Sequence, residues 1–259
     1  MEIQLESKRI IIADLDGTLA ESKKSIDPEM QDLIKTVLNY TFFAITGGGS
    51  YSQFFTQVIN KLNVPSENLK KMYLFPTNAS MLYTYNGKEW IRSYCECLTE
   101  EEKAKIYKAF DIAFKETGYI KPVLDQDDVL EDRITQITFS ALGQKALLEQ
   151  KLKWDPDRSK RMKMKAILDK YLQEFDVRLG GTTSIDVTRK GINKAYAIVT
   201  LEKMGFLRNE MCYIGDALYE GGNDNIMVGL IDTLPVSSPE DTKAILKKLI
   251  NLHSVGNGI

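Results

Sequence analysis

The chain has 259 residues, of which 27% are charged, and a formal net charge of -2. Its length exceeds the ~100–200 residues of a typical domain, so we expect two domains. The nearly neutral charge argues against a nucleic-acid or membrane partner. No apolar run approaches the ~20 residues that span a bilayer, and the first residues are charged rather than signal-like, so we expect a cytoplasmic protein.

Cysteine and histidine contribute little to the expected chemistry. Cys95, Cys97 and Cys212 do not form the paired spacing of a zinc site, so we expect them to be inert or structural. The only histidine is His253, which excludes a Ser-His-Asp triad and a two-histidine metal site. Carboxylates, lysines and hydroxyls must therefore carry any catalysis.

A pair of carboxylates follows the first apolar run. Residues 10–13 read Ile-Ile-Ile-Ala and predict a short buried strand, and Asp14-Leu15-Asp16-Gly17-Thr18 comes directly after it. Strand ends of this kind lie at the carboxyl edge of a parallel sheet, where open α/β folds bind ligands. Two carboxylates there either bind a hard cation or share acid and base roles.

The next segment predicts a βαβ unit. Asp27-Pro28 is typical of a helix N-terminus, and apolar residues at helical spacing follow it. A second apolar run, 42–45, ends in Thr46-Gly47, which predicts another strand with a hydroxyl and a glycine turn at its end.

The pattern changes after Met81. Residues 81–91 predict a β-hairpin with a turn at Asn86-Gly87, and Thr99 with Glu102 predicts a capping box for a helix that ends near Gly118. Residues 133–142 alternate as a half-buried strand does. The basic segment 158–165 is better explained as the solvated face of an amphipathic helix than as a phosphate-binding patch.

Alternation of strand and helix returns near residue 184. A helix capped by Asn193, a buried strand over 211–214 ending in Gly215-Asp216, and a last helix from Ser238-Pro239 complete the chain. We therefore predict an α/β protein with a discontinuous parallel-sheet core, residues 1–84 and 187–259. An α+β module, residues 85–186, is inserted between its two parts.

Four polar sites thus occur at strand ends or at a helix start. They are Asp14-x-Asp16-Gly17-Thr18, Thr46-Gly47, Lys194, and Gly215-Asp216 followed by Gly222-Asn223-Asp224. Singly, each could be a polar turn or a solvated residue. Together and in this order they resemble the haloacid-dehalogenase phosphotransferase superfamily, which implies a Rossmann-like core and an inserted cap.

The residue types suit phosphoryl transfer. Asp14 would attack phosphorus and form an aspartyl-phosphate, while Asp16 would act as general acid and base. Thr46, the amides around Gly47, and Lys194 would bind phosphoryl oxygens and offset the developing charge.

The cofactor that these residues imply is Mg²⁺. Asp14, the backbone carbonyl of Asp16, and Asp216 would supply an all-oxygen site suited to this hard ion. Asn223 and Asp224 would orient those ligands from outside the coordination shell.

Further similarity runs through most of the chain and points to the phosphomannomutase branch of this superfamily. The segments that carry it are Gly47-Gly48-Gly49-Ser50, Phe75-Pro76-Thr77-Asn78, residues 133–144, Gly180-Gly181 with Ser184-x-Asp186, and residues 215–224. The resemblance implies that Arg133, Ser184 and Asp186 of the cap bind a small phosphate ester. It also implies that a homodimer through the cap is an option.

Departures from the phosphomannomutase pattern bear on the reaction. Gln144 replaces a cap arginine, Lys23 replaces an arginine near the first motif, and Ala141 replaces a proline. Thr77 and Ala79 replace a glutamate and a glycine. A mutase must hold a second phosphate, which arginines do best, so the loss of a cation weakens that site.

We therefore expect a Mg²⁺-dependent phosphatase acting on a small phosphorylated metabolite such as a sugar phosphate. The alternative is a phosphomannomutase, in which Arg178 or Arg189 could compensate for Gln144. A remote alternative is an inactive sugar-phosphate-binding protein, which would not need a nucleophile beside an acid.

Overall fold

The computed structural model describes residues 3–122 and 129–256. The chain divides into two compact units, one formed by Met1–Cys95 with Asn193–Ile259 and the other by Glu96–Ile192. Within the described residues, no helix has both the length and the apolar character needed to cross a bilayer.

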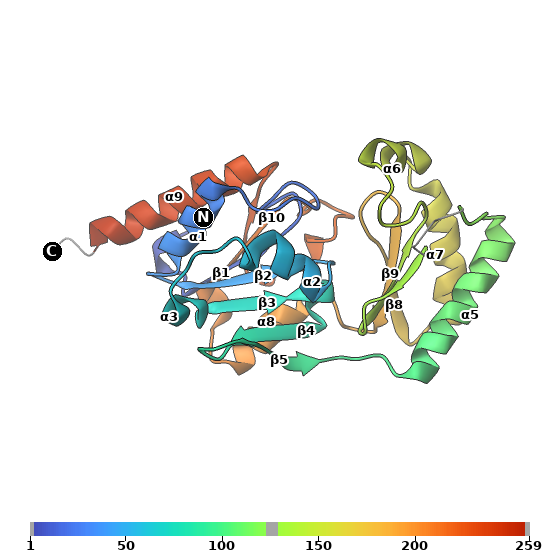
Figure 1. Ribbon diagram of the computed structural model, residues 1–259, viewed down its shortest axis with the longest axis horizontal. Coiled ribbons are helices and arrows are strands. Elements are labelled where there is room, and N and C mark those ends of the chain that lie inside the picture. Colours follow the sequence, from blue (N-terminus) through green and yellow to red (C-terminus); the bar gives the residue numbers. More distant parts are fainter. Residues whose placement is uncertain (1–2, 123–128, 257–259) are drawn as a thin grey trace. The chain divides into compact units, whose positions relative to one another are not determined.

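The larger unit is built on a seven-stranded sheet with the order β11-β10-β1-β2-β3-β4-β5 (Figure 1). The five strands from β11 to β3 in this order run parallel. Strand β4 pairs antiparallel with β3, and β5 pairs antiparallel with β4. The strands are β1 (Ile10–Asp14), β2 (Phe42–Thr46), β3 (Met72–Phe75), β4 (Met81–Tyr85), β5 (Trp90–Cys95), β10 (Met211–Gly215) and β11 (Asp232–Pro235). The predicted α/β core with a parallel sheet is confirmed.

Helices cover both faces of this sheet. The longer ones are α1 (Pro28–Val37), α8 (Tyr196–Lys203) and α9 (Pro239–Gly256), and the short ones are α2 (Tyr51–Phe54), a π-helical turn (Phe55–Ile59), α3 (Ser66–Leu69) and α4 (Pro76–Ala79). Ile11 and Cys212 pack in one apolar cluster with α1 and α9. Ile12 and Tyr213 pack in another cluster with α8, because successive strand residues face opposite sides.

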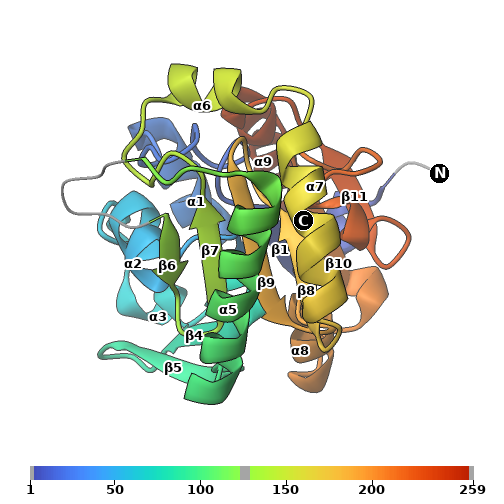
Figure 2. The same ribbon diagram turned by 90° about the vertical axis from the view of Figure 1, so that its right-hand side faces the viewer.

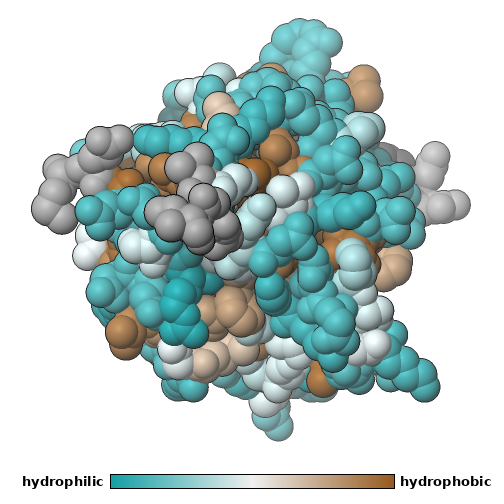
Figure 3. Space-filling view, turned by 90° about the vertical axis from the view of Figure 1, so that its left-hand side faces the viewer, coloured by the Kyte–Doolittle hydropathy of each residue, from teal (hydrophilic) through white to brown (hydrophobic). Residues whose placement is uncertain are grey.

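Among the described residues, one face of the larger unit has no broad apolar area. Figure 3 shows this face as mostly hydrophilic, with small and separate hydrophobic spots. Isolated apolar side chains of this kind are normal on protein surfaces, so we assign no partner to this face.

The smaller unit is an antiparallel sheet with helices on one face (Figure 2). Its strands have the order β6-β7-β9-β8. The elements are α5 (Glu100–Thr117), β6 (Leu130–Asp132), β7 (Gln136–Ser140), α6 (Leu148–Trp154), α7 (Ser159–Tyr171), β8 (Phe175–Leu179) and β9 (Ser184–Arg189). Alternate strand residues, such as Ile137 and Ile185, pack against α5 and α7. The opposite face of the sheet is polar.

Local capping chemistry accounts for the helix starts. The Asp27 carboxylate accepts a hydrogen bond of 2.9 Å from the Met30 amide, and Pro28 is the first residue of α1. Thr99 and Glu102 form the predicted capping box of α5, which ends at Gly118 with a φ of 67°.

The division into units differs from the predicted boundaries at 84/85 and 186/187. Residues 85–95 contain the turn of the predicted hairpin and all of β5, which pairs with β4 in the large sheet. At the other junction, β9 pairs with β7 and β8 to its end, so the smaller unit extends to Ile192. Strand pairing therefore moves both boundaries toward the C-terminus.

The basic segment 158–165 forms the start of α7, but one of its cations is not solvated. Arg161 is 2% exposed, and its Nε donates to the buried Asp155 carboxylate at 2.7 Å. Its Nη1 also donates to the carbonyls of Gly180 and Gly181, each at 2.7 Å. Arg161 thus ties α7 to the loop before β9, which the charge pattern alone did not indicate.

The turn after β3 is strained. Thr77, Asn78 and Ala79 have φ values of 48°, 56° and 64°, and non-glycine residues rarely adopt this left-handed conformation. The amides of Thr77 and Asn78 donate to the carbonyls of Gly49 and Gly47, each at 2.8 Å. These two bonds hold the turn against the Gly47–Gly49 loop.

Replacing Ala79 by glycine should relieve part of this strain. We expect Ala79→Gly to raise the free energy of unfolding by about 0.5–1 kcal/mol in urea denaturation. As a control, Ala197→Gly in α8 should lower it by about 1 kcal/mol, because Ala197 lies in a right-handed helix. Destabilisation by both variants would contradict the strain argument.

Candidate active site

The ends of three neighbouring strands bring the predicted polar residues together. Asp14 and Thr46 are register partners at the carboxyl ends of β1 and β2, and Asp216 follows β10 directly. Asp14 and Thr46 have the same parity as Ile12 and Ala44, which pack on the α8 side of the sheet. The site therefore lies at the carboxyl edge, toward α8.

A buried lysine joins two of the carboxylates. Lys194, two residues before α8, donates from Nζ to Asp14 Oδ1 and to Asp224 Oδ1, both at 2.6 Å. The side chains of Lys194, Asp14 and Asp224 are 2%, 6% and 0% exposed. Such a short pair of contacts in a dry site fixes the positions of both carboxylates.

Three carboxylates form a compact group at this lysine. One oxygen each of Asp14, Asp216 and Asp224 lies within 4.8 Å of the others. One ammonium cannot balance three carboxylates, so the group retains negative charge when all three are ionised. The cluster therefore fits a hard divalent cation, which prefers oxygen ligands. Asp224, predicted to act from outside the coordination shell, belongs to this group, whereas Asn223 is exposed.

Burial dominates the electrostatics of the site. Burial raises the pKa of Asp14 to about 7, and the nearby carboxylates of Asp224 and Asp216 add to the rise while Lys194 opposes it. Burial also opposes the charge of Lys194, but Asp14 and Asp224 hold its pKa well above the usual value. The lysine therefore stays protonated as the cation of this cluster.

Two glycines make room for the carboxylates. A Cβ at Gly17, where φ is +90°, would lie 2.4 Å from Asp216 Oδ2. A Cβ at Gly215 would lie 2.5 Å from Asp224 Oδ2. Any larger residue at either position would displace a carboxylate, so both glycines are needed for close approach.

The carboxylate of Asp16 makes its contacts on a different segment. It accepts hydrogen bonds from the Lys23 amide at 2.7 Å, from Gln53 Nε2 at 3.0 Å and from Gln57 Nε2 at 3.2 Å. Asp16 is not one of the three clustered carboxylates, although it lies near enough to Asp216 to add to the rise that burial causes in the pKa of Asp216. The sequence analysis did not identify Gln53 and Gln57. They follow the Gly47–Gly49 turn and are four residues apart, a spacing that places both on one face of a helix.

The predicted cap residues all lie in the smaller unit. Ser184 and Asp186 occupy the polar face of β9, and Asp186 Oδ1 accepts a bond of 2.9 Å from Thr138 Oγ1. Arg133 follows β6, and its Nη2 donates to Glu131 Oε2 at 2.7 Å.

The two arginines considered as substitutes for the missing cation also have carboxylate partners. Arg178 donates to Asp176 at 2.9 Å on the polar face of β8. Arg189 donates to both oxygens of Glu102, at 2.9 and 2.8 Å, and lies on the helix-covered face of β9. Its strand parity is opposite to that of Asp186, so Arg189 is unsuited to a ligand on the polar face.

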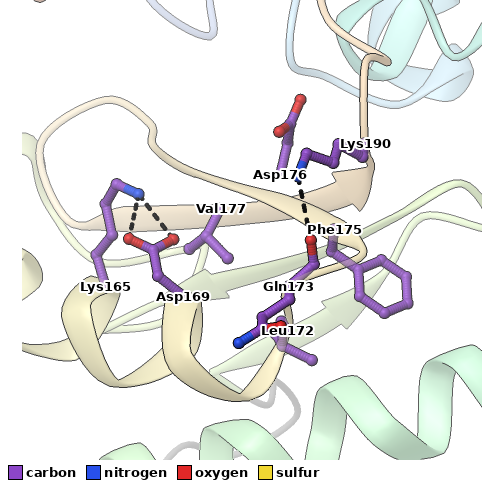
Figure 4. A pocket seen from close by; sticks show the side chains of 8 residues that line it. All are labelled: Lys165, Asp169, Leu172, Gln173, Phe175, Asp176, Val177 and Lys190. Atoms are coloured by element: carbon purple, nitrogen blue, oxygen red, sulfur yellow. Dashed lines mark hydrogen bonds and ion pairs between the residues drawn. The ribbon is translucent and has the colours of Figure 1, made fainter.

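A shallow hollow between α7 and the neighbouring strand β8 is a separate feature of the smaller unit (Figure 4). Its lining residues are Lys165, Asp169, Leu172, Gln173, Phe175, Asp176, Val177 and Lys190. Lys165 pairs with Asp169 at 2.7 Å, and Lys190 donates to the Gln173 carbonyl at 3.4 Å. These cations are engaged within the hollow itself, so we assign it no ligand.

Comparison with known proteins places the chain in a family. The sequence model of the eukaryotic phosphomannomutase family matches residues 30–252. The phosphomannomutase of Schizosaccharomyces pombe is 28% identical over 254 residues, which cover 95% of each chain. That of Spinacia oleracea is also 28% identical, over 92% of this chain and 95% of the relative.

Solved structures share the fold at lower sequence identity. An IMP-nucleotidase of Plasmodium falciparum has a TM-score of 0.73 and 18% identity, over 96% of this chain and 69% of its own. A haloacid dehalogenase-like hydrolase from Bacteroides thetaiotaomicron has a TM-score of 0.66 and 16% identity, over 95% of this chain and 99% of its own. The fold and the predicted motifs define a member of the haloacid-dehalogenase superfamily. Within it, the chain belongs to the eukaryotic phosphomannomutase family.

Removal of the buried lysine should destabilise the fold, because the clustered carboxylates repel one another without it. We expect Lys194→Met to lower the free energy of unfolding by about 3–5 kcal/mol, measured without divalent cations, because buried charges lose their counter-ion. Lys8→Met is the control. Lys8 is also buried, but the side chain of its partner Asp232 is 46% exposed, so this substitution should lower the free energy of unfolding by only about 1 kcal/mol. Equal losses in the two variants would contradict this assignment of charge.

Proposed function

We propose that this chain is a Mg²⁺-dependent phosphomannomutase that transfers a phosphoryl group through Asp14. The arrangement of Asp14, Lys194 and Asp224 at the carboxyl edge of the sheet carries the proposal. The match to the phosphomannomutase family over residues 30–252 supports it. The departures from the phosphomannomutase sequence pattern favour hydrolysis. The family relationship, in contrast, favours the mutase reaction, and we give it more weight.

Each residue has a role in this reaction. An oxygen of Asp14 bonds to phosphorus as the bond from phosphorus to the sugar oxygen breaks, and Asp16 gives its proton to that departing oxygen. Asp16 then removes a proton from the hydroxyl that takes the phosphoryl group back. Thr46 and the amides near Gly47 bind phosphoryl oxygens, and Lys194 offsets the charge on Asp14.

The metal ligands in this proposal are Asp14, Asp216, the backbone carbonyl of Asp16 and, from its place in the cluster, Asp224. Mg²⁺ bound there would reduce the repulsion between an anionic phosphate ester and the carboxylate nucleophile.

The proposed cap supplies substrate contacts through Arg133, Ser184 and Asp186. In a mutase, this unit must bind a second phosphate while the first is on Asp14. Arg133 would have to exchange Glu131 for the phosphate, and a phosphate with two charges competes well for a bidentate cation.

Hydrolysis is the second candidate, and a specific set of contacts favours it. Gln144 offers no charge, and Arg133, Arg178 and Arg189 each contact a carboxylate of their own unit. A weakly bound bisphosphate intermediate would dissociate before it could rebind in the opposite orientation, and water would then take the phosphoryl group from Asp14.

One assay separates the two reactions. Wild-type protein with Mg²⁺, mannose 1-phosphate and a catalytic hexose bisphosphate should form mannose 6-phosphate, as measured by anion-exchange chromatography. Asp14→Asn should abolish turnover, by at least about 10⁴-fold, with unchanged circular dichroism, because the amide is no nucleophile. Free mannose and inorganic phosphate as the main products would instead establish the phosphatase. Binding without turnover would support a sugar-phosphate-binding protein.

Restoring the missing cation should strengthen the second phosphate site. We expect Gln144→Arg to tighten the binding of hexose 1,6-bisphosphate about tenfold, since a charge-assisted hydrogen bond contributes about 1.5–3 kcal/mol. The ratio of isomerised to hydrolysed product should rise with it. Gln144→Met, which has similar length and no charge, is the matched control, and equal effects of both variants would remove the electrostatic explanation.

A further inference from the structure

Tyr213 is a tyrosine in the middle of the apolar strand β10, and its hydroxyl is the feature that packing leaves unexplained. The residue is 0% exposed, and its ring packs in the same cluster as Ile12 and α8. Phenylalanine would fill almost the same space without bringing a hydroxyl out of water. Because a buried hydroxyl is costly unless it has a partner, its partner indicates its purpose.

That partner is the carboxylate cluster. The Tyr213 hydroxyl donates to Asp224 Oδ1 at 2.6 Å, and the same oxygen accepts Lys194 Nζ at 2.6 Å. The other oxygen of Asp224 accepts the Ala217 amide at 3.2 Å. Donors on both oxygens fix the plane of this carboxylate, and one of the three comes from Tyr213.

The same hydroxyl reaches the predicted phosphate-binding threonine. Thr46 Oγ1 lies 3.4 Å from the Tyr213 oxygen and 3.5 Å from the Ala13 carbonyl. Since the Tyr213 proton points to Asp224, Thr46 is the donor in the contact between the two hydroxyls. Both contacts of Thr46 are long, so its proton can turn to a phosphoryl oxygen at little cost.

Strand geometry explains why a residue of β10 can do this. Tyr213 pairs with Ile12 in the parallel register, and it shares the α8 side of the sheet with Asp14 and Thr46. Gly215 clears the space, because a Cβ there would lie 2.6 Å from Tyr213 Cε1.

We propose that Tyr213 is a positioning residue that aligns Asp224 with Thr46, and thereby couples the metal-binding carboxylates to the phosphate-binding hydroxyl. This inference rests on the proposed phosphoryl-transfer function. It assigns Tyr213 no contact with the reacting atoms.

The test compares Tyr213→Phe with wild-type protein in two measurements. Calorimetric titration with Mg²⁺ should show a dissociation constant about tenfold higher, as is usual when a group that orients metal ligands is lost. In the transferase assay, kcat should fall about tenfold while KM changes less than threefold, because the substrate contacts remain. Tyr73→Phe is the control, since Tyr73 belongs to the same apolar cluster but lies on β3, and both values should stay at wild-type levels.

Unnatural residues separate the hydroxyl's donor role from its volume. At position 213, 4-aminophenylalanine retains a donor and should restore Mg²⁺ affinity to within about threefold of wild type, whereas 4-fluorophenylalanine fills the space without a donor and should behave as Tyr213→Phe does. If the fluorinated variant keeps wild-type Mg²⁺ affinity and kcat, the proposal is overturned. If both donor-free variants fail to fold, the hydroxyl serves folding rather than positioning, and the proposal is likewise rejected.

The two measurements also separate this inference from the proposed function. Wild-type protein that binds Mg²⁺ but turns over no phosphate ester would refute the function, and the titration of Tyr213→Phe would still decide the role of the hydroxyl toward Asp224. Wild-type protein that binds no Mg²⁺ would refute both.

Discussion

The contact of the Lys194 ammonium with Asp14 and Asp224 is the interaction on which the site depends. Burial favours the neutral form of Asp14, as the raised pKa of that carboxyl shows. A protonated lysine at 2.6 Å from both carboxylates keeps them in place as acceptors. Burying these charges lowers the stability of the fold, but it holds the proposed nucleophile, Asp14, in a dry environment, where electrostatic stabilisation is strongest.

The rest of the larger unit supplies geometry to that contact. Parallel strands end at one edge, so residues far apart in sequence meet there, and parity places Asp14, Thr46 and Tyr213 on the α8 side. Gly17 and Gly215 permit the close approach of carboxylates. The strained turn at Thr77–Ala79 anchors the Gly47–Gly49 loop through main-chain bonds, a use of strain that is common beside functional sites.

In the proposed function, the smaller unit decides which acceptor takes the phosphoryl group from Asp14. A mutase and a phosphatase share the attack by Asp14 and differ in whether a sugar hydroxyl or water accepts the group afterwards. That choice depends on how firmly a second phosphate is held, and therefore on cations that are free to bind it. Pairing of Arg133 with Glu131 and of Arg178 with Asp176 reduces this freedom, whereas the proposal of transfer to a sugar rests on the match to the phosphomannomutase family.

By itself, the sequence determined the α/β class, the strand ends that carry Asp14, Thr46 and Asp216, and the superfamily. These features are local, since an apolar run followed by a carboxylate or a glycine turn is visible within ten residues. Only the tertiary structure decided that Asp224 joins the carboxylate cluster, that Arg161 is buried, and that the Tyr213 hydroxyl faces Asp224. Each of these depends on which distant segments meet, and a side chain's partner across a sheet is set by register and parity rather than by its neighbours in the chain.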